Sequence, residues 1–142
     1  MKTVQDNYPK AYLYMRIVQA KLFIDKHYSQ SIKLDNIIGE AFFSKYHFIR
    51  VFTKIYGYTP YQYLKSLRIK KAQQLLMEGG EISDVAYSVG FESVTTFFNL
   101  FKKEVGYTPA VYRHLYVKRK DEINNAPLSF IPGCYAEKMD RS

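Results

Sequence analysis

The sequence predicts an all-α protein built from two tandem helix-turn-helix subdomains joined by a long connecting helix. Three observations support this: a segment that occurs twice, apolar residues at helical spacing, and paired Gly and Thr-Pro signals where helices should end and begin. We expect the first subdomain, with the connecting helix, over residues 17–78, and the second over residues 79–117. Residues 1–16 are then an N-terminal extension and residues 118–142 a C-terminal tail.

The repeated segment is the most informative of these observations. The twelve residues Phe52–Tyr63 and the twelve residues Phe101–Tyr112 are identical at seven positions, at an offset of 49 residues. Two copies of one structural unit are therefore present. So small a number of copies argues against a solenoid of stacked repeats.

The first copy predicts a helix, a tight turn and a second helix. Four apolar residues recur at the spacing of one helical face: Leu34, Ile37, Ile38 and Ala41. A break is expected near Phe42 and Phe43. Ser44 then serves as the N-cap of the second helix, which ends at Gly57.

The connecting helix follows the first copy. Thr59 is suited to cap it, and Pro60 suits the first helical position, where no N–H is needed. Apolar residues continue to Met77, and Gly79 and Gly80 end the pattern. At 1.5 Å per residue the helix would be about 27 Å long, a rigid spacer between the two units.

The second copy repeats the same order of signals. Its first helix has four apolar residues at helical spacing: Ile82, Val85, Ala86 and Val89. Gly90 supplies the turn, Glu92 or Ser93 opens the next helix, and Gly106 ends it. Thr108 and Pro109 then begin a further helix.

Several classes of protein are disfavoured by composition. The single Cys134 forms no internal disulfide, and three scattered histidines match no zinc spacing, so we expect no metal, no cofactor and a reducing, cytoplasmic location. No signal peptide or long apolar span is evident, so no membrane partner is expected. No glycine-rich phosphate loop or catalytic triad is evident, so we expect no enzyme.

The charge favours an anionic partner without distinguishing DNA, RNA and lipid. The chain has 21 Lys and Arg against 13 Asp and Glu, a net charge of +8. Residues 41–77 contain seven basic residues and no acid, whereas residues 78–104 contain five acids and two lysines. Attraction to phosphate is therefore expected mainly from the first half, although a solvated basic face without a partner is the alternative.

Helical projection separates a buried and an outward face on the second helix of each copy. In the first copy the expected buried residues are Phe48, Val51, Phe52 and Ile55, and the outward ones are Tyr46, Ile49, Arg50 and Thr53. In the second copy the expected buried residues are Phe97, Leu100 and Phe101, and the outward ones are Thr95, Phe98, Asn99 and Lys102. The two outward sets correspond one to one at the repeat offset.

The outward residues suit the edges of bases in a major groove. Arg50 is able to make a bidentate contact to guanine and Asn99 to adenine, while Ile49 and Phe98 are able to contact thymine methyl groups. The alternative is that Ile49 and Phe98 pack against the connecting helix or a terminal segment.

Taken in order, these motifs resemble the AraC/XylS family, whose DNA-binding domain joins two helix-turn-helix units by a long helix. The family signature Gly-x-Ser/Thr-Pro-x-x-Tyr is matched by Gly57–Tyr63 and by Gly106–Tyr112. Leu67-Arg68-Ile69 in the connecting helix and Val89-Gly90-Phe91-Glu92-Ser93 before the last unit also fit. The resemblance covers about residues 17–115.

The resemblance implies a set of DNA-contacting residues. Base contacts would come from Tyr46, Ile49, Arg50, Val94, Thr95, Thr96, Phe98 and Asn99. Phosphate contacts would come from Lys45, His47, Lys54, Lys102 and Lys103, which position the domain without specifying sequence. It further implies a transcription activator that binds double-stranded DNA and recruits RNA polymerase.

Two residues depart from the family pattern. Phe42 stands where the family usually has a small turn residue, and if the position needs positive φ a bulky residue costs on the order of 1 kcal/mol. Asn99 stands where arginine is frequent and its surroundings are acidic, so the second unit is expected either to add specificity with little affinity or to engage DNA only weakly. The short flanking segments leave no room for a sensor domain, which points to stand-alone members that act as monomers on asymmetric sites.

Two other functions compete with this interpretation. A protein-binding adaptor with incidental DNA affinity would use the outward faces and the tail, and Arg50→Ala would then leave target occupancy unchanged. DNA-repair methyl transfer would need a reactive, preferably metal-bound cysteine, for which only Cys134 is present.

Overall fold

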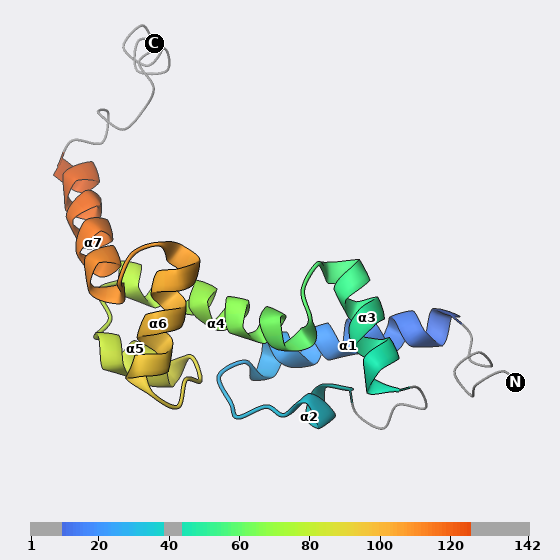
Figure 1. Ribbon diagram of the computed structural model, residues 1–142. Helices are drawn as coiled ribbons and strands as arrows, with labels where there is room; N and C mark the ends of the chain where they lie inside the picture. The colour runs from blue at the N-terminus through green and yellow to red at the C-terminus, as the bar shows by residue number, and fades with distance from the viewer. Residues whose placement is uncertain (1–9, 39–43, 126–142) are drawn as a thin grey trace, which may run out of the picture.

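Seven α-helices make up the part of the chain that the computed structural model describes, residues 10–38 and 44–125 (Figure 1). They are α1 (Lys10–His27), α2 (Leu34–Ile38), α3 (Lys45–Tyr56), α4 (Pro60–Met77), α5 (Ile82–Ser88), α6 (Val94–Val105) and α7 (Pro109–Asn125). No strand occurs within these ranges. Helices α1 to α3 gather along one half of α4, and α5 to α7 along the other (Figure 1). The predicted all-α fold with a long connecting helix is confirmed.

Short hydroxyl side chains begin the helices at the positions that the sequence indicated. The Ser44 hydroxyl accepts a hydrogen bond from the backbone N–H of His47 at 3.1 Å. In the second unit the Ser93 hydroxyl accepts one from the N–H of Thr96 at 3.2 Å. Thr59 caps α4 in a reciprocal capping box. These bonds satisfy N–H groups that have no acceptor inside the helix, so they locate the starts of α3, α4 and α6.

Glycines in the left-handed conformation end α3 and α6, and another forms the turn of the second helix-turn-helix unit. Gly57 and Gly106 have φ of 79° and 89°, and a Cβ at either position would meet no atom within 4 Å. Gly90, between α5 and α6, has φ of 103°. Residues with a Cβ avoid this conformation, so these three turns depend on glycine. Phe42, the expected residue of the first turn, lies outside the described residues.

Each half of the molecule has its own apolar core. The first core contains Ile17, Ala20, Ile24, Ile37, Ile38, Phe48, Phe52 and Leu64. The second contains Ile69, Ala72, Leu76, Val85, Ala86, Val89, Phe91, Phe97, Phe101 and Tyr112. Helix α4 contributes to both, and Tyr28 packs against both. The halves are therefore two small cores on one shared helix, and Tyr28 joins them.

A polar cluster ties α1 to the first turn of α4. The Tyr63 hydroxyl donates a hydrogen bond to Asp25 Oδ1 at 2.5 Å, and Lys21 Nζ lies 2.7 Å from Asp25 Oδ2. Burial acts to raise the pKa of Asp25, but the bonds from Lys21 and Tyr63 outweigh it and lower that pKa. The cluster thus holds a charged carboxylate between two helices.

Two of the expected subdomain boundaries fall inside helices. Helix α1 begins at Lys10 and passes through residue 17 without a break, and Leu13 packs on the first core. Helix α7 continues past residue 117 to Asn125. The first half therefore begins earlier than the helical pattern indicated. Within the described residues no helix is both long and apolar enough to cross a bilayer.

The expected burial of Ile55 is wrong. Its side chain is 45% exposed, whereas Phe48 and Phe52 are fully buried. Tyr56 takes the place next to them, with its ring centroid 4.8 Å from that of Phe52. The core contacts α3 along the four-residue row of Phe48, Phe52 and Tyr56, so Ile55 lies to one side of it.

Candidate nucleic-acid interface

The outer face of α3 presents three neighbouring side chains that were expected to contact bases. Tyr46 is 75% exposed, and the guanidinium carbon of Arg50 lies 5.8 Å from the centroid of its ring. Ile49 is half-buried and lines a shallow hollow with both of them. The Thr53 hydroxyl donates to the Ile49 carbonyl at 2.7 Å, so it is engaged within its own helix. The exposed polar groups on this face belong to Tyr46, Arg50 and Lys54, which line the same hollow.

The outer face of α6 presents a different set. Phe98 is 39% exposed, and Thr95 and Asn99 are exposed beside it. Thr96 also lies on the surface, but its hydroxyl accepts a hydrogen bond from the capping serine at 2.8 Å. Val94 is half-buried and packs on the second core. Thr95, Phe98 and Asn99 are therefore the side chains of this helix best placed to meet a partner.

The side chains expected to contact phosphate all lie on these two helices. They are Lys45, His47, Lys54, Lys102 and Lys103. The four lysines are exposed, and the histidine is half-buried. Lys45 forms a solvent-exposed ion pair with Asp35. Because an exposed pair contributes little, a phosphate could replace the carboxylate at small cost.

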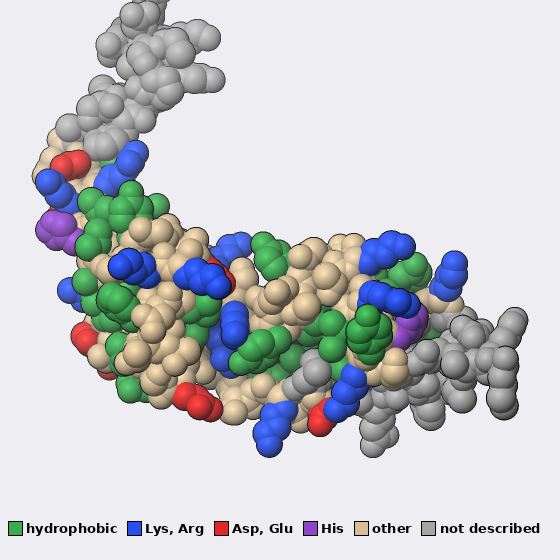
Figure 2. Space-filling view, viewed as in Figure 1, with side chains coloured by type: hydrophobic (Ala, Val, Ile, Leu, Met, Phe, Trp, Pro, Cys, Tyr) green, Lys and Arg blue, Asp and Glu red, His purple; other side chains and the backbone are tan. Residues whose placement is uncertain are grey.

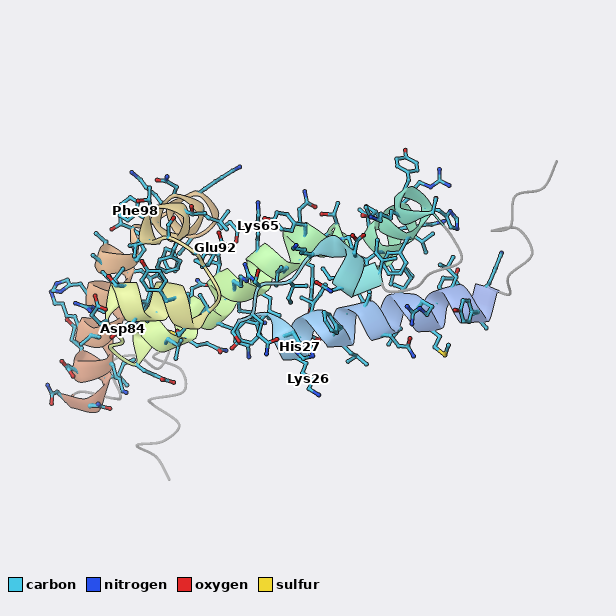
Figure 3. All side chains as sticks on the ribbon, turned by 90° about the horizontal axis from the view of Figure 1, so that it is seen from below. Lys26, His27, Lys65, Asp84, Glu92 and Phe98 are labelled. Atoms are coloured by element: carbon cyan, nitrogen blue, oxygen red, sulfur yellow. The ribbon has the colours of Figure 1, made fainter. Side chains whose placement is uncertain are left out.

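Helices α3 and α6 lie on the same side of α4. Figure 3 shows both at one edge of the molecule, with Phe98 on α6 and Lys65 on α4 directed to that edge. Lys26 and His27, at the end of α1, lie on the opposite side (Figure 3). Figure 2 looks onto the α3 and α6 face and shows Lys and Arg side chains over both helices. The fold thus turns two outward faces, 49 residues apart in sequence, to the same side of the molecule.

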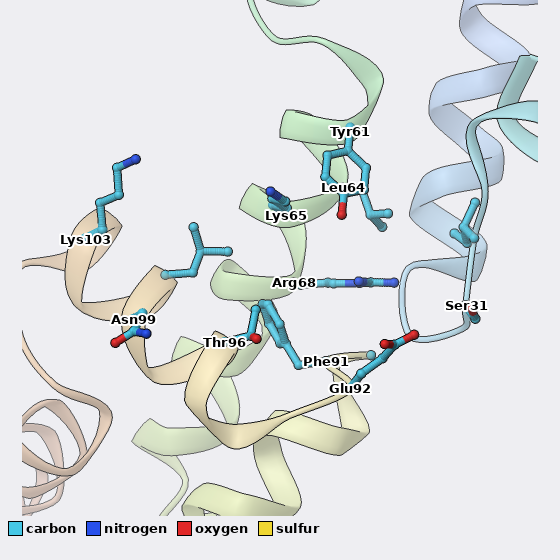
Figure 4. A pocket seen from close by; sticks show the side chains of 13 residues that line it. Ser31, Tyr61, Leu64, Lys65, Arg68, Phe91, Glu92, Thr96, Asn99 and Lys103 are labelled. Carbon is cyan, nitrogen blue, oxygen red and sulfur yellow. The ribbon is translucent and has the colours of Figure 1, made fainter.

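A groove of about 540 Å³ separates the two units on this face (Figure 4). It is lined from α4 by Tyr61, Leu64, Lys65 and Arg68, from α6 by Thr96, Asn99, Leu100 and Lys103, and from the intervening segments by Ser31, Ile32, Gly90, Phe91 and Glu92. Lys65 and Lys103 stand on two different helices that border it (Figure 4). The groove therefore carries positive charge between the two outward faces.

Lys65 is a candidate that helical projection of the two repeated helices did not identify. Its Nζ lies 4.4 Å from the centroid of the Tyr61 ring, and it makes no ion pair within the described ranges. Lys65 belongs to the basic run of the connecting helix, residues 65–71, and that run is the sequence feature that could have pointed to it. The packing of α4 against the other helices decides which lysine or arginine of the run faces the interface. The run by itself does not encode that packing.

Two acidic residues of the second half, Glu81 and Asp84, lie away from the outer face of α6, whereas Glu92 lines the groove and Glu104 is an exposed residue of α6 itself. Glu81 caps α5, where its carboxylate accepts hydrogen bonds from the N–H groups of Ser83 and Asp84, and these bonds lower its pKa. Asp84 is directed away from the edge that carries Phe98 (Figure 3). The α6 side of the interface therefore combines lysines with two carboxylates, so its positive charge is partly offset.

Comparison with known proteins identifies the family. A model of the helix-turn-helix domain matches residues 38–114, more than half of the chain. The chain belongs to the AraC/XylS family of transcription regulators. The DNA-binding domain of AdpA, solved in complex with a target DNA, superposes with a TM-score of 0.70 and 26% identity, over 75% of this chain and 96% of that one.

Two curated AraC/XylS relatives show how far the likeness extends. The probable transcription factor PqrA of Proteus vulgaris is 36% identical over 86 residues, which are 60% of this chain and 70% of PqrA. The bifunctional transcriptional activator/DNA repair enzyme AdaA of Bacillus subtilis is 34% identical over 94 residues, 66% of this chain and 44% of AdaA. The chain thus spans less than half of AdaA.

Proposed function

We propose that this protein is a sequence-specific, double-stranded DNA-binding transcription regulator. Helices α3 and α6 enter successive major grooves on one face of B-DNA, with centres about 34 Å apart. The observation that carries the proposal is the position of the two outward faces on the same side of α4. The likeness to the DNA-bound AdpA domain supports it.

The two helices read bases with different chemistry. Arg50 on α3 contacts guanine O6 and N7, with Tyr46 and Ile49 beside it, and Asn99 on α6 contacts adenine N6 and N7. Phe98 meets a thymine methyl group, and Thr95 contacts a neighbouring base. Val94 and Thr96 lie at the start of α6 and shape its approach, because packing and capping already engage them.

Phosphate contacts surround these base contacts. Those on the two recognition helices come from Lys45, His47, Lys54, Lys102 and Lys103. Lys65 joins them from the groove, where the phosphates between the two major grooves would pass. Neutralised phosphates release counterions, so affinity falls steeply as salt rises.

One chain supplies both recognition helices, so we propose a monomer on an asymmetric site. Such a regulator would work in the bacterial cytoplasm and activate transcription by recruiting RNA polymerase. AdaA, which is described as a transcriptional activator, supports the activating role.

Selection of bound sequences from a random duplex library, at about 150 mM salt, tests the proposal, because non-specific phosphate attraction is already reduced there. The expected result is one asymmetric motif that spans two adjacent major grooves. Repeating the selection with Arg50→Ala should relax one position of that motif.

Three other results would contradict parts of the proposal. A motif confined to one groove would mean that one helix does not read bases. A palindromic motif would contradict the monomer. No enrichment at all would favour the adaptor, in which the outward faces bind protein and the DNA affinity is incidental.

A further inference from the structure

Segments that are far apart in sequence meet where the two halves of the molecule touch. Arg68, in the middle of α4, donates a hydrogen bond from Nε to the carbonyl of Tyr28 at 2.7 Å. Its Nη2 donates to the carbonyl of Gln30 at 2.8 Å. Both carbonyls belong to the segment between α1 and α2. One planar guanidinium therefore holds two backbone acceptors of the first half in a fixed arrangement.

The same guanidinium touches the second half. A Cβ on Gly90 would lie 2.8 Å from the Tyr28 carbonyl oxygen and 2.9 Å from Arg68 Nε, so the turn before α6 is in direct contact with both groups. The guanidinium carbon lies 5.9 Å from the ring centroid of Phe91, a residue of the second core. Figure 4 shows Arg68 between the Ser31 segment and Phe91. The halves are thus joined by a second connection besides α4.

The contacts of Arg68 separate it from the other cations of the basic run. Burial lowers its pKa, although the side chain keeps hydrogen-bond partners for its charge. Because both donors are directed to carbonyls inside the molecule, Arg68 is poorly placed to contact phosphate.

We propose that Arg68 is a positioning residue that locks α3 and α6 in one relative orientation, and that this lock sets the spacing of half-sites that the protein accepts. The orientation is a property of the free protein, whereas the spacing rests on the proposed DNA-binding function. Inserting one base pair turns one major groove relative to the next by about 35° and moves it by about 3.4 Å. A rigid pair of helices cannot follow that change, but a loosened pair can.

A measurement without DNA tests the lock itself. Nitroxide labels are placed on α3 and α5 through Ile55→Cys and Tyr87→Cys, both at exposed positions, in a Cys134→Ser background. Pulsed electron paramagnetic resonance then gives the distribution of distances between them. Arg68→Lys keeps the charge without the planar fork, and Arg68→Gln keeps a planar amide without the charge. We expect a narrow distribution in the parent and a broader one in both variants.

The matched control is Arg113→Lys. Arg113 Nη1 also donates to a backbone carbonyl, that of Gly80 at 3.2 Å, but both residues lie in the second half. The same chemical change there should leave the distribution narrow. A narrow distribution in the Arg68 variants, or broadening by Arg113→Lys as well, would overturn the lock.

A second measurement needs no variant that might fail to fold. The parent chain is titrated with its selected duplex and with the same duplex carrying one extra base pair between the half-sites. Two linked recognition helices bind about 100-fold or more tightly when their spacing matches that of the half-sites. We therefore expect the insertion to weaken binding by the parent chain by about tenfold or more. Equal parent affinity for both duplexes would refute the spacing role.

The Arg68→Lys chain is titrated in the same way. We expect the insertion to weaken its binding by less than about threefold. A penalty as large as that of the parent would contradict the proposal. If selection yields no two-part site, the proposed function fails, and the distance measurement still decides whether the lock exists.

Discussion

Helices α3 and α6 are built alike but offer different side chains to the surface. Each is 12 residues long, begins after a capping serine and ends at a left-handed glycine. Each buries two phenylalanines four residues apart: Phe48 and Phe52 in α3, Phe97 and Phe101 in α6. The repeated residues are those that shape and anchor the helix. This is why one scaffold serves both positions.

The outward residues differ because they do not pack. Helix α3 presents Tyr46 and Arg50, and α6 presents the uncharged Thr95, Phe98 and Asn99. Positions free of packing constraints can change without loss of the fold, so two copies of one unit can acquire separate specificities. The comparison teaches that affinity and specificity need not be divided equally between the halves.

The signature tyrosines that anchor the helices after α3 and α6, Tyr63 on α4 and Tyr112 on α7, also differ in their partners. Tyr63 donates to a carboxylate on α1, whereas Tyr112 has an amide partner, Gln73, at 3.5 Å. Burial, together with Tyr116, raises the pKa of Tyr112 to about 12. The same signature tyrosine thus sits in a charged cluster in one half and a neutral one in the other.

The largest expected effect tests whether the two cores are separate. Phe52→Ala and Phe101→Ala should each lower the free energy of unfolding by about 3–5 kcal/mol, because each leaves a cavity in a core. Urea unfolding measures the loss, and hydrogen exchange locates it. We expect Phe101→Ala to reduce protection in α5 to α7 more than in α1 to α3. Equal loss in both halves would mean that the cores unfold as one unit.

The next largest effect compares the base contacts proposed for α3 with those proposed for α6. Arg50→Ala should weaken DNA binding by about 1–3 kcal/mol and relax one base position, because a bidentate contact is lost. Asn99→Ala should relax a position in the other half-site with a smaller loss of affinity, since no charge is removed. Titration and repeated selection measure both. Tyr87→Ala, an exposed residue of α5, serves as the control and should change neither.

A smaller effect tests whether the helix ends are equivalent. Gly57→Ala and Gly106→Ala should each destabilise the protein by about 1–2 kcal/mol, since both force a Cβ into the left-handed conformation in open space. Gly90→Ala should cost more, because its Cβ would also meet the Tyr28 carbonyl. Thermal unfolding of the three variants provides the comparison. Three equal losses would show that the contact at Gly90 is relieved by a small shift.

The smallest effect concerns acid stability and belongs to the first half alone. The folded pKa of Asp25 is below its ordinary 3.8, so its contribution is complete above that pH and is lost as pH falls through the lower folded pKa. Tyr63→Phe should reduce this acid-dependent part by less than about 1 kcal/mol. Tyr112→Phe should leave the acid dependence as it was. Unfolding followed from about pH 5 to about pH 2 measures it, and equal slopes for both variants would remove this difference between the halves.

Much of the fold was predictable because its signals are local. The bounds of the connecting helix, the serine caps of α3 and α6 and their glycine ends follow from residues within one turn of each boundary. Most of the exposed residues of the candidate interface were predictable for the same reason, since the repeat and the helical period identify them, although Ile49 and Thr53 are half-buried. Which of those residues contact DNA stays a prediction.

Three features of the structure could not be predicted from local sequence signals. Ile55 is apolar and lies near the buried stripe, but the angle at which the core meets α3 leaves it exposed. Helix α1 begins seven residues before the expected boundary, since its core contacts are made with other helices. Lys65 and Arg68 lie one helical turn apart on α4, yet Lys65 is half-buried at the border of the groove, whereas Arg68 donates to carbonyls 38 and 40 residues away.

The sequence by itself determined the number of repeated units, the boundaries of α3, α4 and α6 and most of the residues of the two outward faces, because capping and periodicity act over a few neighbouring residues. Only the tertiary structure decided that both faces turn the same way, and which arginine joins the two halves. Those outcomes depend on packing between segments about 40 residues apart, and no local pattern encodes the geometry of that packing.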